Sequence, residues 1–426
     1  MEKYVIEGGF NLSGSVTVSG NKNEALPVIA ACLLTDETLR LRNVPRIGDV
    51  QILLDIIKSL GASVEEINQN DLTISCKNLK DKEIDQEKCA KLRASILLAG
   101  PLLSRFGRVN LPPPGGDVIG RRRLDTHFIA FQKLGAKIEV KNSFFIEARN
   151  LIGADIFLDE PSVTATENAI MASVLAKGTT ILRNAACEPH VMGLANMLNS
   201  MGAKIEGIGT HVLKIDGVEK LAGADHSISA DYLEVGSYIV LAAVTDSEIT
   251  IKKTSPEHLY VINTTFQKLG IQYNIRGNDI HVPAGQKLKI QTDFGGEIPK
   301  IEDGPWPAFP SDLMSIVIVA ATQAEGVILA FEKMYDGRMF FIDYLVAMGA
   351  RIVLCDPHRV VIVGPSQLYG SQMQSPDIRA GMALIIASLC ATGESTIYNI
   401  KQIDRGYESL DHKLQALGAK IRRVVD

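Results

Sequence analysis

The sequence lacks the features that mark membrane, secreted or nucleic-acid-binding proteins. Its apolar runs, such as residues 314–321, are much shorter than the ~20 residues of a membrane-spanning helix. It starts with neither a signal peptide nor a transit peptide. Its six cysteines include no Cys-x-x-Cys pair, which favours reduced thiols and a cytoplasmic location.

Excess charge, aromatic residues and metal-binding motifs are also missing. With a formal net charge of −5 and 6% aromatic residues, neither a basic field nor a stacking surface for nucleic acid is expected. No zinc spacing, P-loop, nucleophile elbow or dinucleotide fingerprint occurs. We therefore expect no metal, no dinucleotide cofactor and no nucleic-acid or membrane partner, and no obligatory protein partner is evident.

The chain does have length and apolar area. Its 426 residues, 46% of them hydrophobic, suffice for two or three packed domains of an α/β or α+β class. A Leu/Met-Gly-Ala/Ile pattern recurs with glycines at 61, 135, 202, 270, 349 and 418. The spacing of about 70 residues indicates internal duplication and exceeds the usual solenoid period, so the solenoid alternative is disfavoured.

Each repeated glycine follows an apolar stripe with helical spacing and precedes an alternating, strand-like segment. We expect these glycines to end helices in the left-handed conformation, with Asp49 and Asp404 as N-caps of the first and last of them. A second, more apolar helix precedes each one, at 25–34, 94–103, 167–175, 235–243, 312–321 and 379–389. The pattern predicts two domains of three helix–strand units each.

Three kinds of segment interrupt the repeat and carry charge. Residues 19–24 place Lys22 in a glycine-marked helix start that suits an anion, although a solvated lysine is the alternative. Residues 111–125 combine prolines, paired glycines and three adjacent arginines, which is typical of an anion-binding lid. A basic surface patch is the alternative there.

Further arginines stand at equivalent places in the units. These arginines are Arg93, Arg338, Arg379 and Arg405. Arginines that open a helix oppose its macrodipole, so an anionic partner explains them better than packing does. Asp312 occupies a similar place, and helix capping is the favoured interpretation of that residue alone. The residues together indicate a site for a polyanionic small molecule.

Five segments resemble the enolpyruvyl transferase family, and within it the UDP-N-acetylglucosamine 1-carboxyvinyltransferases. They are residues 19–27, 92–96, 115–122, 307–312 and 403–408, so the resemblance runs from end to end. It implies two inside-out α/β barrel domains of three repeats each. A catalytic, nucleotide-sugar domain would span 22–229 with a lid at 112–122, and a discontinuous domain would combine 1–21 with 230–426.

The resemblance also implies the reaction. The enolpyruvyl group of phosphoenolpyruvate would pass to the 3′-hydroxyl of UDP-N-acetylglucosamine with release of phosphate. That reaction is the first committed step of peptidoglycan synthesis, and so serves cell-wall formation, cell shape and division. No cofactor is implied.

Roles for single residues follow from the same resemblance. Asp117, Asp312, Lys22 and Arg405 would be catalytic, with Asp312 taking the proton of the 3′-hydroxyl. Phosphate would be held by Lys22, Arg122 and Arg405, and the donor carboxylate would lie near Arg338 and Arg379. Asn23 and Asp312 would face the sugar, and Met334 would contact substrate. The uridine diphosphate would contact Arg93, Leu124, Asp125, Ser162 and Val163.

Three residues depart from the family pattern. Most members carry cysteine where this chain has Asp117, and a protonated aspartate can take over protonation of the C3 methylene. A carboxylate is a far weaker nucleophile than a thiolate, so we expect no covalent adduct with the epoxide fosfomycin and hence resistance to it. Glu160 and Tyr232 replace commoner basic residues and leave room for another nucleotide-linked acceptor.

Three alternatives to the main interpretation stay open. The acceptor could be shikimate 3-phosphate, although that enzyme's first motif reads Asp-Lys-Ser where this chain has residues 21–23 as Asn-Lys-Asn. It could instead be another nucleotide. A non-catalytic protein that binds the nucleotide sugar as a regulator is the third, and measurable phosphate release separates it from the enzymes.

Overall fold

The computed structural model describes residues 2–117 and 119–425, and these form two compact units. The central unit comprises Gly20–Asp117 and Arg122–Ser229, and the terminal unit comprises Met1–Ser19, Val118–Arg121 and Ala230–Asp426. The expected lid, 112–122, is therefore divided between the units. The reason is local: the Ile119 carbonyl accepts a hydrogen bond from the Gly337 amide at 3.0 Å.

The central unit builds three sheets around buried helices. Its helices are α1 (Lys22–Ala31), η1 (Cys32–Leu34), α2 (Gly48–Ser59), α3 (Gln86–Cys89), η2 (Arg93–Leu98), α4 (Ala99–Phe106), α5 (Asp125–Lys133), α6 (Val163–Ser173) and α7 (Pro189–Ser200). Its strands are β3 (Thr38–Arg42), β4 (Ser63–Glu66), β5 (Leu72–Ser75), β6 (Arg108–Leu111), β7 (Lys137–Val140), β8 (Phe144–Glu147), β9 (Asp155–Phe157), β10 (Thr179–Arg183), β11 (Lys204–Glu206), β12 (Val212–Asp216) and β13 (Asp225–Ser227). The sheet orders are β13-β3-β5-β4, β6-β8-β7 and β11-β12-β10-β9.

The terminal unit repeats this plan. Its helices are α8 (Tyr232–Val244), η3 (Pro256–His258), α9 (Tyr260–Lys268), η4 (Phe294–Gly296), η5 (Ser311–Leu313), α10 (Met314–Gln323), η6 (Arg338–Phe341), α11 (Ile342–Ala347), α12 (Ile378–Cys390), η7 (Ile400–Arg405) and α13 (Leu410–Ala416). Its strands are β1 (Glu2–Glu7), β2 (Ser13–Thr17), β14 (Glu248–Lys252), β15 (Asn274–Arg276), β16 (Asp279–Val282), β17 (Lys300–Glu302), β18 (Gly326–Phe331), β19 (Arg351–Asp356), β20 (Arg359–Gly364), β21 (Gln372–Gln374), β22 (Glu394–Tyr398) and β23 (Lys420–Val425). The sheet orders are β15-β16-β14-β2, β17-β18-β20-β19 and β21-β22-β1-β23.

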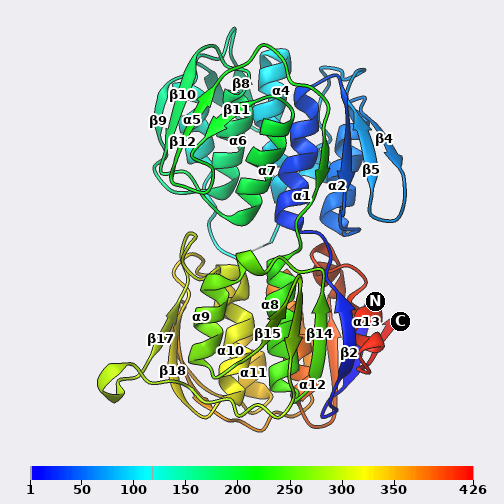
Figure 1. Cartoon of the computed structure of the whole chain (residues 1–426), viewed down its shortest axis with the longest axis vertical. Helices are drawn as coiled ribbons and strands as arrows, with labels where there is room; N and C mark the ends of the chain where they lie inside the picture. The colour runs from blue at the N-terminus through cyan, green and yellow to red at the C-terminus, as the bar shows by residue number, and fades with distance from the viewer. Residues whose placement is uncertain (1, 118, 426) are drawn as a thin grey trace. The chain divides into compact units, whose positions relative to one another are not determined.

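Helices form the inside of each unit and sheets form the outside. Helices α8, α10 and α12 are apolar nearly all round, lie side by side and are buried along almost their whole length (Figure 1). Strands such as β14 alternate between buried and more exposed residues, with one face on those helices and the other toward solvent. The expected pair of inside-out α/β domains with three repeats each is confirmed.

Each repeat has the same strand order, and the sixth repeat needs both ends of the chain. In the first five repeats, the last strand pairs between the other two, as β5 does between β3 and β4. In the sixth, β1 takes that place between β22 and β23 and pairs antiparallel with both. This arrangement makes the terminal unit discontinuous in sequence.

The strands that precede α1 and α8 are exchanged between the two units, so each strand pairs in the unit that does not contain the helix after it. In three other repeats the strand before the buried helix pairs parallel with the strand after it, as β9 does with β10 across α6. Strand β2, which precedes α1, pairs instead with β14. Strand β13, which precedes α8, pairs with β3. The chain therefore passes into the central unit after β2 and returns to the terminal unit after β13, in addition to the short segment Val118–Arg121 that the terminal unit also contains.

The repeated glycines end helices as expected. All six have positive φ, from 78° to 107°. At the first, the Gly61 amide donates to the Lys58 carbonyl at 3.0 Å and the Ala62 amide donates to the Ile57 carbonyl at 3.1 Å. This is a Schellman motif, and the other five glycines repeat it. A side chain at these positions would be strained, which is why the pattern is visible in the sequence.

The predictions that Asp49 and Asp404 are N-caps were wrong. Ile47 precedes α2 and Ser409 precedes α13, and neither makes a side-chain capping hydrogen bond. Asp49 lies in the first turn of α2 with its carboxylate 2.8 Å from the Lys22 ammonium group. Asp404 lies in η7, 2.7 Å from the Arg423 guanidinium group. Both acids pair with cations far away in the sequence, and these pairs replace the local caps.

Candidate active site

In the terminal unit, Asp312 lies between two arginines from other elements. Its carboxylate oxygens are 2.5 Å from Nη2 of Arg338, which opens η6, and 3.2 Å from Nε of Arg379, near the start of α12. No side-chain capping bond occurs at the start of α10. The capping interpretation of Asp312 was therefore wrong, because the charged contacts come from residues 26 and 67 positions away.

The two arginines are buried cations, and each has a nitrogen that donates no hydrogen bond within the described residues. Arg338 is 8% exposed and Arg379 is 4% exposed. Burial alone lowers the pKa of Arg338, but the carboxylates of Asp312 and Asp377 outweigh it and raise that pKa. Within the described residues, Arg338 Nε and Arg379 Nη1 reach no acceptor. Buried N–H groups of this kind call for a ligand oxygen, and a charged donor favours an anionic one.

Helix α12 fixes the direction of Arg379. The Asp377 side chain caps the helix and accepts hydrogen bonds from the amides of Arg379 and Ala380 at 2.8 and 3.0 Å. The guanidinium carbon of Arg379 lies 5.3 Å from the centroid of the Tyr407 ring. The Tyr407 hydroxyl is in turn 3.1 Å from the Ser237 hydroxyl on α8. Packing and capping therefore hold this cation in one orientation.

Two further predicted residues of the terminal unit lie beside these elements. Arg405 ends η7 and donates to the Gln402 side chain at 2.7 Å. Met334 is 42% exposed and lies in the segment between β18 and η6. Asp312, Met334, Arg338, Arg379 and Arg405 therefore all belong to the terminal unit.

In the central unit, Lys22 is a paired and largely buried cation. Asn21 caps α1 by accepting from the Asn23 amide at 2.8 Å, and Lys22 is the first residue of the helix. The Lys22 side chain is 12% exposed, and Asp49 on α2 holds its ammonium group. The alternative of a solvated lysine is therefore wrong.

The glycine- and arginine-rich loop, residues 111–125, is held in place by main-chain and side-chain hydrogen bonds. The Gly115 amide donates to the Cys89 carbonyl at 2.9 Å, and a Cβ at Gly115 would lie 1.7 Å from the Ala90 carbonyl oxygen. Arg122 Nη2 donates to the Asp117 carbonyl at 3.0 Å. Arg93 Nη2 donates to the Arg122 carbonyl at 2.8 Å. The loop thus gathers Arg93, Asp117 and Arg122 within one unit.

The starts of α5 and α6 carry the other four predicted residues of this unit. Leu124 and Asp125 lie at the start of α5, and Ser162 caps α6, which begins at Val163. Two residues that the sequence analysis missed link the two starts: Asp159 accepts from Arg123 at 3.0 Å and from Thr126 at 2.6 Å. The run of three arginines was noted, but only one acceptor of Arg123, Asp125, is close in sequence, and the other, Asp159, lies 36 residues away.

His127 also links α5 to α6 and was likewise missed. Its Nδ1 lies 3.0 Å from Asn168 Nδ2, and its Nε2 lies 3.1 Å from the Thr164 hydroxyl. Because the amide can only donate, Nδ1 accepts and the proton is on Nε2. Burial, and secondly the charge of Arg93, lowers the pKa of His127 to about 3.

This histidine predicts a pH dependence of stability. Its lowered pKa favours the folded state above the unfolded value of about 6.5, and that stabilisation is lost as the pH falls toward 3. Between pH 6.5 and 5, the wild-type protein should lose about 2 kcal/mol more than His127→Gln does. Denaturant unfolding at both pH values measures this. The exposed control His412→Gln should follow the wild type, and equal losses in all three proteins would contradict the assignment.

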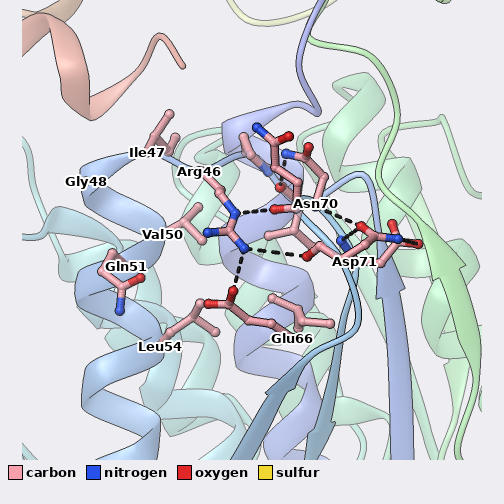
Figure 2. A pocket seen from close by; sticks show the side chains of 14 residues that line it. Arg46, Ile47, Gly48, Val50, Gln51, Leu54, Glu66, Asn70 and Asp71 are labelled. Carbon is pink, nitrogen blue, oxygen red and sulfur yellow. Dashed lines mark hydrogen bonds and ion pairs between the residues drawn. The ribbon is translucent and has the colours of Figure 1, made fainter. Parts of the chain in front are cut away.

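A pocket elsewhere in the central unit contains none of the predicted site residues. It has a volume of about 210 Å³ and lies at the start of α2 (Figure 2). Its arginine, Arg46, pairs with Glu66 and with the Gln69 carbonyl. Across residues 2–117 and 119–425, no helix is long and apolar enough to cross a membrane, and no group of acidic, histidine or cysteine side chains is arranged to hold a metal ion.

Comparisons with known proteins identify the family. Residues 6–414 match the family described as EPSP synthase (3-phosphoshikimate 1-carboxyvinyltransferase). The chain is 59% identical over 422 residues to the UDP-N-acetylglucosamine 1-carboxyvinyltransferase of Bradyrhizobium diazoefficiens, covering 99% of this chain and 98% of that protein. It is 55% identical over 425 residues to the enzyme of that name from Borreliella burgdorferi, covering 100% and 99%.

Solved structures share the fold at low sequence identity. The enolpyruvyl transferase NikO from Streptomyces tendae superposes with a TM-score of 0.89 at 22% identity, covering 100% of this chain and 99% of that one. EPSP synthase from Acinetobacter baumannii gives a TM-score of 0.76 at 18% identity with full coverage of both chains. The chain therefore belongs to the EPSP synthase family, and within it to the UDP-N-acetylglucosamine 1-carboxyvinyltransferases.

Proposed function

We propose that this protein transfers the enolpyruvyl group of phosphoenolpyruvate to the 3′-hydroxyl of UDP-N-acetylglucosamine and releases phosphate. The observation that carries the proposal is the Asp312 carboxylate held between Arg338 and Arg379, two buried arginines with N–H groups to spare. A carboxylate can take the hydroxyl proton while the cations bind an anionic donor. Relatives that are 47–59% identical and carry this enzyme name support the choice of acceptor.

The chemistry assigns one proton transfer to each of two carboxyl groups. As the 3′-oxygen bonds to C2 of the enol, Asp312 takes the hydroxyl proton and Asp117 gives a proton to C3. Phosphate then leaves C2, and loss of a proton from C3 restores the double bond. Lys22, Arg122 and Arg405 stabilise the phosphate, and Arg338 and Arg379 face the donor carboxylate. Charge stabilisation and positioning supply the rate enhancement.

The remaining assignments concern the nucleotide sugar. Asn23 faces the sugar, Met334 contacts substrate, and the starts of η2, α5 and α6 hold the uridine diphosphate through Arg93, Leu124, Asp125, Ser162 and Val163. This makes the central unit the nucleotide-sugar unit, with residues 112–122 as the lid. Support comes from the way Asp159 and His127 fix the start of α5 relative to α6. We place the reaction in the cytoplasm, which the six free thiols favour.

The assignment of Asp117 makes a prediction. Replacing Asp117 with asparagine should lower turnover by about 10²-fold or more, because the amide cannot supply the proton. The main-chain carbonyl of Asp117 carries the bond from Arg122, so the substitution leaves that contact in place. Steady-state phosphate release measures the effect. Wild-type turnover in Asp117→Asn would remove the acid role.

A phosphate-release assay tests the function as a whole. Phosphoenolpyruvate is supplied with UDP-N-acetylglucosamine, with shikimate 3-phosphate or with free UMP, and binding of each acceptor is measured in parallel. Release with UDP-N-acetylglucosamine alone is expected. Release with another acceptor would reassign the specificity. Binding without release from any acceptor would make the protein a nucleotide-sugar-binding regulator.

A further inference from the structure

Two buried carboxyl groups directly follow two neighbouring strands of the terminal unit. Asp303 follows β17, and Glu332 follows β18. These strands are parallel neighbours whose last residues, Glu302 and Phe331, are paired. The strand pairing therefore places Asp303 and Glu332 side by side, at the ends of the two strands. Both residues are 0% exposed.

One carboxylate oxygen of the Asp303–Glu332 pair has a hydrogen-bond donor only if one of the two carboxyl groups is protonated. Asp303 Oδ1 accepts from the Lys333 amide at 2.5 Å, whereas no donor reaches Asp303 Oδ2 among the described residues. Burial, then the hydrogen bond with Asp303 and its charge, raises the pKa of Glu332 well above its usual range. A proton on Glu332 gives Asp303 its missing donor, and it avoids two adjacent buried negative charges.

Glu332 also bonds to the two segments that carry Asp312 and Arg338, the ion pair of the candidate site. Its carboxyl oxygens each accept from the Ser311 hydroxyl at 2.9 Å, and Ser311 immediately precedes Asp312. Glu332 Oε1 accepts from the amides of Met334 and Tyr335 at 3.2 and 3.1 Å, at the start of the segment that leads to Arg338. One carboxyl group thus anchors the residue before Asp312 and the start of the segment that leads to Arg338.

We propose that Asp303 and Glu332 share one proton, and that this pair positions Asp312 and Arg338 for the transfer reaction. The inference rests on the proposed function for its catalytic consequence, but the shared proton is a property of the ligand-free protein. Neither residue touches a reacting atom in this proposal. They are positioning residues that act through Ser311 and through residues 333–335.

The surroundings of the pair set its pH response. Arg338 from η6 favours a negative charge on Glu332, and Asp312 from η5 pairs with that arginine. From the turn between β19 and β20, His358 donates through Nδ1 to the Glu332 main-chain carbonyl at 2.7 Å. Loss of the shared proton at alkaline pH would set two buried carboxylates against each other. Ser311 and residues 333–335 would then shift, so activity should fall on the alkaline side.

Two substitutions of Glu332 test this response. Glu332→Gln keeps a neutral hydrogen-bonding group of the same shape, so kcat at neutral pH should stay within a few-fold of wild type and the alkaline decline assigned to the pair should disappear. Glu332→Ala removes the anchor, and a misplaced base should lower kcat by about 10²-fold with little change in KM. An unchanged alkaline decline in Glu332→Gln would overturn the proposal.

A matched pair of serines tests the link to Asp312. Ser311→Ala removes the hydroxyl that joins Glu332 to the residue before Asp312, and it should lower kcat more than it raises KM. Ser315 lies one turn later in α10, is 5% exposed, and its hydroxyl reaches no partner among the described residues. Ser315→Ala should therefore keep wild-type kcat. Equal effects of the two substitutions would contradict a positioning role for Ser311.

Infrared difference spectroscopy tests the proton without any substrate. The spectrum of wild-type protein minus Glu332→Gln at neutral pH should contain a carbonyl band of a protonated carboxylic acid. The band's absence would overturn the shared proton. If the band is present but the wild-type protein releases no phosphate with any acceptor, the proposed function fails and the proton-sharing pair stands.

Discussion

Replacing Asp312 with asparagine is expected to lower kcat by about 10²- to 10⁴-fold, the range over which a positioned general base contributes to catalysis. Asparagine keeps the shape of the side chain but cannot take the proton of the acceptor hydroxyl. It also removes the counter-charge of two buried arginines, Arg338 and Arg379. Phosphate release under saturating substrates measures kcat.

The loss of charge should also affect stability. Breaking a buried ion pair costs about 3 kcal/mol, and the partial exposure of Asp312 places the expected loss at or below that value. Thermal unfolding separates this loss from the loss of kcat at a temperature where the variant is folded. Asp343→Asn, an exposed acid on α11, serves as the control and should leave both quantities unchanged. A folded Asp312→Asn with wild-type kcat would contradict the base assignment.

Replacing Lys22 with glutamine is expected to lower kcat/KM for phosphoenolpyruvate by about 10²- to 10³-fold, as removal of one preorganised donor to a developing charge does. The substitution also leaves Asp49, which is 2% exposed, without the ammonium group that holds it. A drop in stability should therefore accompany the drop in activity. Initial rates at varied phosphoenolpyruvate concentration measure the effect.

A double variant separates these two losses. Lys22→Gln combined with Asp49→Asn removes both charges of this ion pair, so it should recover most of the stability but none of the activity. Lys58→Gln, on the exposed last turn of α2, is the matched control and should behave as wild type. If the double variant regains activity together with stability, Lys22 has a structural role and no part in binding phosphate.

Local sequence patterns predicted the repeated architecture because each pattern reflects a local physical requirement. The six glycines stand where the backbone turns left-handed, and the amides around each one complete the same hydrogen-bonding motif. The all-round apolar helices could be recognised for a similar reason, because only a helix enclosed by others tolerates such a surface. These features depend on residues a few positions apart.

The pairing of charges could not be predicted in the same way. The rules for helix caps gave Asp49, Asp312 and Asp404 local roles, and the structure gives each a cation from a distant segment. The Asp303–Glu332 pair likewise depends on two strands that are neighbours in a sheet, although the two residues are far apart in the sequence. Sequence distance carries no information about such contacts until the strand order is known.

The pairing of β1 between β22 and β23 has a consequence for protein engineering. Glu2 lies opposite Val425 in the antiparallel ladder, so a short linker can join these two residues. A circular permutant that opens before Gly20 would then remove the connection after β2 and keep the one after β13. Such a permutant offers a way to ask what the connection after β2 contributes to turnover.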